Sequence, residues 1–187
     1  MACEKPVHLI VAVSRNGMGI GKNGNLPWRL RKDMKYFAEM TSKTKLDSKQ
    51  NAVIMGRKTW DSIPEKFRPL PNRVNVILSK SLAEKPAGAH HLCTSLEDAL
   101  NVVSKSSTGD NVESIWIIGG GAVYKEAVNK SLCNRIYLTR VLADFDCDTF
   151  FPEFDTKLYQ LIVDPEVNGE VQEEKGIEFK YEIYERS

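Results

Sequence analysis

The stretch Ile115-Trp-Ile-Ile-Gly-Gly-Gly-Ala-Val-Tyr124 joins an apolar run to three glycines and then to a segment without helix breakers. The apolar run predicts a buried strand over residues 114–118, and residues 122–129 are typical of a helix. Glycines let the backbone approach a ligand, and a helix that follows them offers free amide N–H groups to phosphate. This order predicts a nucleotide pyrophosphate site. The spacing Gly-x-Gly-x-x-Gly is absent, so a tight turn built only for positive φ stays open as the alternative.

Strands and helices alternate on both sides of this stretch. Apolar runs predict strands over residues 7–13, 52–55, 75–78, 135–141 and 179–185. Helices are expected over residues 29–41, in a short segment leading into Ile63, and over residues 96–103, where Thr94 or Ser95 caps the first turn. Short buried strands between helices predict a mainly parallel α/β sheet with helices on both faces. The alternation of Phe179, Tyr181 and Ile183 indicates an antiparallel strand near the C-terminal end.

Composition and charge narrow the class of protein. The chain has 187 residues, 42% hydrophobic and 27% charged, which is typical of one globular domain. With 26 basic and 25 acidic residues, no global field would draw the chain onto nucleic acid or a membrane surface. We expect a single domain, by default a monomer, whose activity needs neither nucleic acid nor membrane.

The four cysteines, Cys3, Cys93, Cys133 and Cys147, lack Cys-x-x-Cys spacing, so reduced structural thiols and no metal site are expected. The start Met-Ala-Cys-Glu-Lys-Pro lacks the order of a secretory signal, and no apolar run approaches the roughly 20 residues of a membrane span. A cytoplasmic location is the resulting prediction.

Two cationic positions suggest anion recognition. Val53-Ile-Met-Gly-Arg-Lys-Thr59 repeats the strand and glycine pattern with two adjacent cations, which together favour a doubly charged phosphate and hence NADP over NAD. Arg73, between a proline-rich loop and a strand, could grip a carboxylate with its planar fork of donors. Solvated surface charges, and for Arg73 a surface salt bridge, are the alternatives.

Asp33 is the most unusual acid of the chain. At helical spacing it shares an apolar stripe with Met34, Phe37 and Ala38. A lone carboxylate there pays a desolvation penalty unless it is partnered or neutral, which predicts a functional acid or a ligand anchor. The alternative is a slightly rotated helix on which Asp33 is solvated.

Several reaction classes lack their usual signatures. The chain contains no Gly-x-Ser-x-Gly elbow, no His-Glu-x-x-His and no Gly-Lys-[Ser/Thr] phosphate loop. Redox chemistry with a bound nucleotide is the reaction class that these absences leave open. Four of the eight residues 17–24 are glycine, which predicts a mobile loop without a regular secondary-structure element.

Taken in order, seven segments closely resemble the dihydrofolate reductase family: Ile10-Val-Ala-Val13, Gly19-Ile-Gly21, Asn25-Leu-Pro-Trp28, Asp33-Met-Lys-Tyr-Phe37, Met55-Gly-Arg-Lys-Thr-Trp60, Ile118-Gly-Gly-Gly121 and Asp148-Thr-Phe-Phe-Pro152. The resemblance spans nearly the whole chain. It implies one domain over residues 1–187 with a central, mostly parallel eight-stranded sheet, helices on both faces and an antiparallel C-terminal strand. An NADPH adenosine-binding portion is expected within about residues 52–125.

The resemblance also implies the residues of two binding sites. NADPH would contact Ala12, Ile20, Gly21, Gly56, Arg57, Lys58, Thr59, Leu78, Ser79, Lys80, Ile118, Gly120, Gly121, Ala122, Val123, Tyr124 and Thr149. Folate or dihydrofolate would contact Ile10, Val11, Ala12, Asp33, Met34, Phe37, Ser62, Ile63, Phe67, Leu70, Arg73, Ile118, Tyr124 and Thr139. Antifolate inhibitors are expected in the same pocket.

The implied reaction is hydride transfer from NADPH to C6 of dihydrofolate with protonation at N5, which supports one-carbon metabolism and thymidylate synthesis. The implied catalytic residues are Leu26, Trp28, Asp33, Tyr124 and Thr139. Asp33 would anchor and polarise the pterin while water delivers the proton. A related pteridine or pyrimidine reductase and a non-catalytic folate- or nucleotide-binding module are the alternatives.

Overall fold

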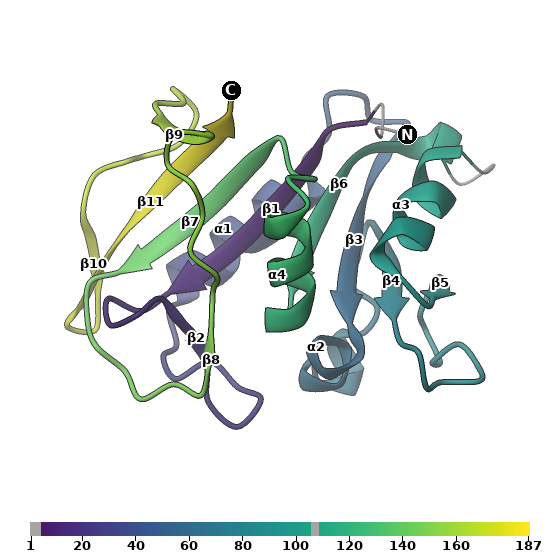
Figure 1. Ribbon diagram of the computed structural model, residues 1–187, viewed down its shortest axis with the longest axis horizontal. Helices are drawn as coiled ribbons and strands as arrows, with labels where there is room; N and C mark the ends of the chain where they lie inside the picture. Colours follow the sequence, from purple (N-terminus) through teal and green to yellow (C-terminus); the bar gives the residue numbers. More distant parts are fainter. Residues whose placement is uncertain (1–4, 106–108) are drawn as a thin grey trace.

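Nearly continuous apolar runs form the central strands of a sheet in the computed structural model, which describes residues 5–105 and 109–187. Within those residues the sheet has nine strands; eight follow the order β10-β11-β7-β1-β6-β3-β4-β5 (Figure 1), and β9 pairs with β11. Their bounds are β1 Val7–Val13, β3 Gln50–Gly56, β4 Arg73–Leu78, β5 His91–Cys93, β6 Val112–Gly119, β7 Arg135–Val141, β9 Tyr159–Ile162, β10 Gln172–Glu174 and β11 Ile177–Arg186. The predicted eight-stranded α/β sheet is confirmed, with β9 as an addition.

The strand directions place one edge of the sheet at the carboxyl ends of its parallel strands. β1 pairs in parallel with β6 and β7, and β3, β4 and β5 continue the parallel order beyond β6. β11 runs antiparallel to β7, with Phe179 opposite Val141 and Glu185 opposite Arg135, which confirms the antiparallel C-terminal strand. In open α/β sheets, ligands bind beyond the carboxyl ends of the strands.

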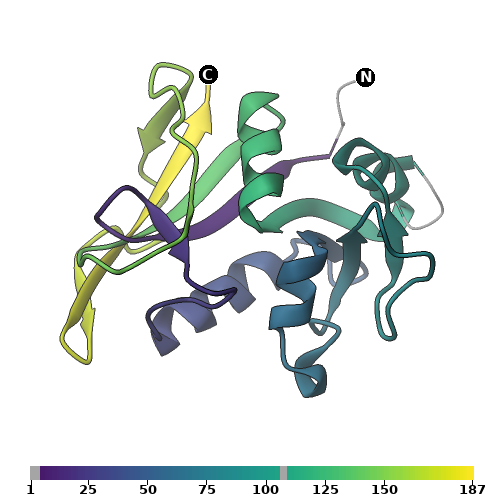
Figure 2. The ribbon, with the colours of Figure 1, turned by 60° about the horizontal axis from the view of Figure 1, so that its bottom comes forward.

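Helices cover both faces of this sheet. Within the described residues they are α1 Arg31–Ser42, α2 Arg57–Ser62, α3 Leu96–Lys105 and α4 Gly121–Asn129, with 3-10 turns at Glu65–Phe67 and Gly109–Asn111. α3 and α4 bury Leu96 and Ala127 against one face. α1 and α2 lie on the opposite face, where Trp60 is buried and Phe37 packs (Figure 2). The prediction of helices on both faces is therefore confirmed.

Two helix starts correct or refine the sequence prediction. α1 begins at Arg31 rather than at residue 29, because Leu30 keeps an extended backbone (φ −121°) and is buried in a cluster with Phe179. At α3 the cap is Ser95 rather than Thr94, since the Asp98 amide donates to Ser95 Oγ at 3.0 Å.

The glycine-rich segment 17–24 was expected to lack regular structure, and that expectation was wrong in part. It contains the short strand β2 Gly19–Gly21, which pairs antiparallel with β8 Thr149–Phe150. A Cβ at Gly19 would overlap Cys147 Sγ and Ser14 Oγ, so close packing requires glycine there. This pairing joins the glycine-rich segment to residues far along the chain.

Among the described residues, no helix is long and apolar enough to cross a membrane, and no cluster of acidic, His and Cys side chains could hold a metal. Cys93 and Cys133 are buried free thiols, and Cys147 is a partly buried one. Cys3 lies outside the described residues.

Candidate active site

The glycine turn lies where β6 ends and α4 begins. Gly119 has φ +130°, in a region that favours glycine, and its peptide bond to Gly120 is cis. Gly120 is the N-cap of α4, and no side-chain hydrogen bond caps this helix. A Cβ at Gly121 would lie 2.8 Å from Thr149 Cγ2. The turn therefore presents a bare backbone and the positive end of a helix at the carboxyl edge of the sheet.

Other residues predicted for the cofactor surround this turn. Thr59 Oγ1 lies 3.3 Å from the position of a Cβ on Gly120, and Ile20 Cδ1 lies 4.0 Å from one on Gly121. A Cβ on Gly56 would lie 3.5 Å from Val123 Cγ2. A hollow of about 440 Å³ adjoins the turn and is lined by Gly121, Ala122, Lys125, Asp148, Thr149, Phe150, Phe151 and Pro152. The structure brings this part of the predicted site together.

The predicted cations lie beyond the ends of two neighbouring strands. Gly56 pairs with Leu78, so Arg57 and Lys58 follow β3 while Ser79 and Lys80 follow the adjacent β4. Arg57 and Lys58 are exposed, and Arg57 forms an exposed ion pair with Asp61 at 3.6 Å. They are solvated, as the alternative reading expected, yet they share the edge of the sheet that carries the glycine turn.

Asp33 lies in the first turn of α1 and faces β7. Its Oδ1 accepts a hydrogen bond from Thr139 Oγ1 at 2.7 Å, and Thr139 is only 2% exposed. Burial raises the pKa of Asp33 to about 6, the Thr139 hydrogen bond lowers it, and the nearby Glu174 carboxylate raises it further. The alternative of a fully solvated Asp33 is therefore wrong.

Two further predicted catalytic residues, Trp28 and Tyr124, are buried in different core clusters. Trp28 is buried against Phe145 at 5.2 Å between ring centroids, and its Nε1 has no hydrogen-bond partner among the described residues. Tyr124 donates its hydroxyl to the Ile10 carbonyl at 2.8 Å, and burial raises the pKa of Tyr124. This hydrogen bond links α4 to β1.

Arg73, the first residue of β4, contacts the C-terminal end of α1. It is 5% exposed, its Nη1 donates to Thr41 Oγ1 at 2.8 Å, and its Nε donates to the Pro71 carbonyl at 2.9 Å. Desolvation lowers the pKa of Arg73, and no carboxylate within the described residues pairs with it. The alternative of a surface salt bridge is therefore wrong. The helix rise of about 1.5 Å per residue places Asp33 and Thr41 about 12 Å apart along α1.

The remaining predicted substrate residues divide by exposure and by face. Phe37, Ile63 and Leu70 pack around one core cluster, in which Ile10 and Ile118 are buried. Three others are exposed, namely Ser62 at the end of α2 and the large side chains of Met34 and Phe67. Leu26, which was predicted as a catalytic residue, is also more than half exposed.

The side chain of Val11, which was predicted to contact the substrate, points to a different face of the sheet from that of Ile10. It belongs to the cluster on the opposite face of the sheet from Ile10, because neighbouring residues of a strand point to opposite faces. The Val11 side chain therefore points away from the face of the sheet that α1 covers. Ala12, which pairs with Thr139, is partly buried beside Trp28.

Two residues at the ends of α1 were not predicted. Thr41 holds Arg73, and Glu174 accepts the amide N–H groups of Arg31 and Lys32. The only sequence signal was Leu30 before the helix, since an apolar N-cap leaves amides that need a partner from elsewhere.

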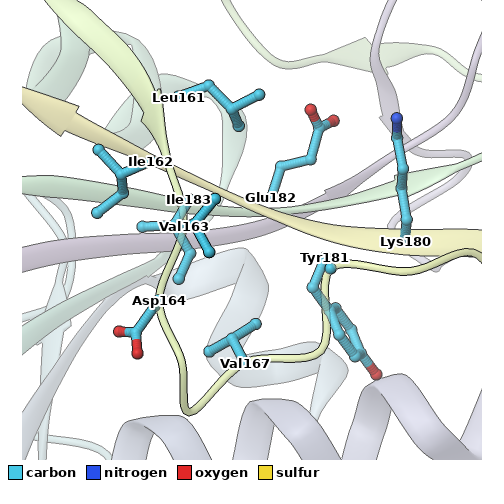
Figure 3. A pocket seen from close by; sticks show the side chains of 10 residues that line it. Leu161, Ile162, Val163, Asp164, Val167, Lys180, Tyr181, Glu182 and Ile183 are labelled. Atoms are coloured by element: carbon cyan, nitrogen blue, oxygen red, sulfur yellow. The ribbon is translucent and has the colours of Figure 1, made fainter.

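A second groove is lined by residues of β9, of the segment that follows it and of β11. Figure 3 shows its lining, with Leu161 and Val163 on one side and Lys180 to Ile183 on β11. It contains none of the predicted site residues.

Fold and site together define a protein of the α/β class with a glycine turn at the carboxyl edge of its sheet and a partly buried acid, Asp33, on a neighbouring helix. Residues 6–186 match the model of the family described as dihydrofolate reductase. Dihydrofolate reductases of Sus scrofa and Mus musculus are each 52% identical, covering 98% and 97% of this chain and 99% and 98% of theirs. The solved Schistosoma mansoni dihydrofolate reductase superposes with a TM-score of 0.85 at 38% identity, covering 98% of this chain and 99% of its own.

The chain belongs to the dihydrofolate reductase family. It is therefore an oxidoreductase of tetrahydrofolate biosynthesis that uses a nicotinamide cofactor. Neither a related pteridine or pyrimidine reductase nor a non-catalytic binding module is favoured by this match.

Proposed function

We propose that the chain reduces 7,8-dihydrofolate to 5,6,7,8-tetrahydrofolate with NADPH, and that Asp33 and Arg73 hold the two ends of the substrate. The observation that carries this proposal is that α1 has a partly buried carboxylate, Asp33, in its first turn and holds the buried Arg73 of β4 through Thr41, which lies about 12 Å farther along the helix. One binds Thr139 and the other binds Thr41, so both are fixed before a ligand arrives.

The glycine turn fits a dinucleotide. Side chains at Gly120 and Gly121 would fill the space beside Thr59 and Thr149, and the uncapped start of α4 favours an anion. When bound, the nicotinamide ring supplies the hydride. The cofactor contacts are proposed to be Ala12, Ile20, Gly21, Gly56, Thr59, Ile118, Gly120, Gly121, Ala122, Val123, Tyr124 and Thr149.

NADPH, rather than NADH, is the proposed cofactor. Arg57 and Lys58 follow β3, and Ser79 and Lys80 follow the adjacent β4 with Leu78 at its end. Three cations and a hydroxyl at one edge of the sheet suit a phosphate dianion better than a ribose hydroxyl. We place the adenosine-binding portion within about residues 52–125 of one domain that spans residues 1–187.

The substrate would lie along α1. Asp33 suits the amino and N3 side of the pterin, and Arg73 suits a carboxylate of the glutamate because its planar fork can donate two parallel hydrogen bonds. The side chains proposed to pack between them are Ile10, Met34, Phe37, Ser62, Ile63, Phe67, Leu70 and Ile118, with the backbone of Val11. Tyr124, whose ring packs on the opposite face of the sheet, is proposed to contact the substrate from beside the glycine turn.

Proton delivery to N5 is proposed to run through water. A carboxylate on the N3 side of the pterin is on the wrong side of the ring for direct transfer. Trp28 Nε1, which has no hydrogen-bond partner among the described residues, and the second carboxylate oxygen of Asp33 are polar groups that can hold a water molecule. With a pKa of about 6, Asp33 can polarise the ring in the neutral pH range. Leu26 is proposed to help close this part of the site.

We further propose a cytoplasmic monomer that works without nucleic acid and is inhibited by antifolates. A net charge of +1 and free thiols at Cys93, Cys133 and Cys147 support this setting.

The test is the loss of NADPH absorbance on adding dihydrofolate. We expect turnover by the unchanged chain, a large fall in kcat for Asp33→Asn, and little change in the Kd for NADPH. Glu39→Gln is the matched control, because this acid of the same helix is exposed and forms a surface ion pair with Lys35 at 3.8 Å. Unchanged turnover in Asp33→Asn would refute the role of Asp33, and binding of both ligands without turnover would refute the reaction.

A further inference from the structure

The hairpin formed by β10 and β11 meets α1 at the turn that carries Asp33. Glu174, the last residue of β10, accepts the Arg31 amide N–H through Oε2 at 2.7 Å and the Lys32 amide N–H through Oε1 at 2.9 Å. The N-cap of α1 is Leu30, which has no polar side chain for these amides. A residue more than 140 positions away in the sequence thus caps this helix.

Further contacts hold the same turn from both sides. Lys32 Nζ donates to the Glu173 carbonyl at 3.2 Å, and Tyr181 donates its hydroxyl to the Lys32 carbonyl at 3.2 Å. Figure 3 shows the Tyr181 side chain pointing from β11 toward the helix. Leu30 is buried with Tyr181 in one cluster. The hairpin therefore fixes the backbone on the N-terminal side of Asp33.

We propose that Glu174 is a positioning residue for Asp33, holding the first turn of α1 in place and setting the charge around the buried acid. The inference deepens the proposed function and rests on the proposed role of Asp33. The Glu174 carboxylate accepts hydrogen bonds from the helix backbone, so it acts through Asp33 rather than on substrate.

The charged and polar groups around Asp33 determine in which direction Glu174 shifts the pKa of Asp33. The groups that face Asp33 are Tyr36 on α1, Thr139 on β7, Tyr181 on β11 and Glu174 on β10. Glu174 is the one carboxylate among them, and the Lys32 and Arg31 amides hold the pKa of Glu174 below its usual range. Glu174 is therefore charged at the pH at which Asp33 titrates.

Two effects of removing the Glu174 charge act in the same direction. The like charge no longer opposes ionisation of Asp33, and the freed amides at the start of α1 attract the carboxylate in its first turn. Both effects lower the pKa of Asp33, whereas simple loosening of the helix would let water reach Asp33 without any dependence on salt.

The experiment follows the Asp33 carboxyl by ¹³C NMR in the ligand-free protein, with its resonance assigned by loss in Asp33→Asn. Glu174→Gln should move the titration midpoint of Asp33 down by roughly a few tenths of a pH unit. Added salt should move the unchanged protein toward that lower value and leave Glu174→Gln nearly unmoved, because a partly exposed charge is screened.

Glu173→Gln is the matched control, since this neighbouring side chain bonds the Gly176 amide of the hairpin turn and not α1. Glu174→Asp, which keeps the charge, should retain the salt dependence. Thermal unfolding of each variant verifies that it is folded. Equal midpoints in Glu174→Gln and Glu173→Gln, or an upward move in Glu174→Gln, would overturn the proposal. An active Asp33→Asn would instead refute the role of Asp33 and leave the measured effect of Glu174 standing.

Discussion

Replacing Thr139 with valine tests how the buried acid is held. The substitution keeps the branched shape but removes the hydroxyl that donates to Asp33 Oδ1 at 2.7 Å. Thr139 is 2% exposed, so water cannot readily take the place of this donor. A hydrogen bond to a charged group contributes about 1.5–3 kcal/mol, which at about 1.36 kcal/mol per pH unit corresponds to roughly 1–2 pH units. The midpoint of Asp33 should therefore rise from about 6 to roughly 7–8.

The same change has a defined effect on stability. The pKa of Asp33 lies above its ordinary 3.8, so the folded chain binds more protons than the unfolded chain between pH 3.8 and about 6. Stability contributed by this group is present below pH 3.8 and is lost as the pH rises through about 6. In Thr139→Val the loss should continue to roughly pH 7–8 and deepen by about 1.5–3 kcal/mol.

Urea unfolding at pH 5 and pH 8, together with NMR titration of Asp33, measures both effects. Thr94→Val is the matched control, because it removes an exposed hydroxyl-to-carboxylate hydrogen bond, to Asp98 at 3.0 Å, that water can replace. An unchanged or lowered midpoint for Asp33 in Thr139→Val would refute the reasoning, as would an equal pH dependence of stability in the two variants.

Three further predictions concern the other parts of the site. Arg73→Lys should raise the KM for dihydrofolate about tenfold to a hundredfold with kcat little changed, because the planar fork is lost; steady-state kinetics measure this, and an unchanged KM would contradict it. Gly121→Ala should weaken NADPH binding, since the new Cβ would lie 2.8 Å from Thr149 Cγ2, and adding Thr149→Ser should restore part of the affinity measured by calorimetry. Arg57→Gln with Lys58→Gln should raise the KM for NADPH and leave that for NADH nearly unchanged; an equal effect on both cofactors would argue against a phosphate at these cations.

Strands with strong local signals were predicted, and weakly marked ones were not. The run over residues 7–13 coincides with β1, because a buried central strand is apolar along its whole length. β5, β9 and β10 have three or four residues each with several partly buried or exposed positions, so no periodicity marked them. Their existence depends on pairing with β4 and β11, which is decided at long range.

At the site, residue types were predictable and their environments were not. Asp33 was marked by its apolar neighbours, but its desolvation depends on Thr139, more than 100 residues away. Arg73 had no local sign of burial, because the group that receives it is Thr41 at the end of another element. Glu174 had no signal of its own, since one acid among 25 on a short strand is indistinguishable from a surface charge.

Helix α1 explains why these long-range contacts matter together. It carries Asp33 in its first turn and Thr41, which binds Arg73, in its last, and a rise of about 1.5 Å per residue separates Asp33 from Thr41 by about 12 Å along the helix axis. Glu174 fixes the start of the helix, and the Asn51 amide, which donates to the Thr41 carbonyl at 3.0 Å, fixes its end. Because the helix is held at both ends, it sets the positions of both Asp33 and the Thr41-bound Arg73 for the proposed substrate. Loosening either end of the helix should therefore weaken both charged contacts rather than one.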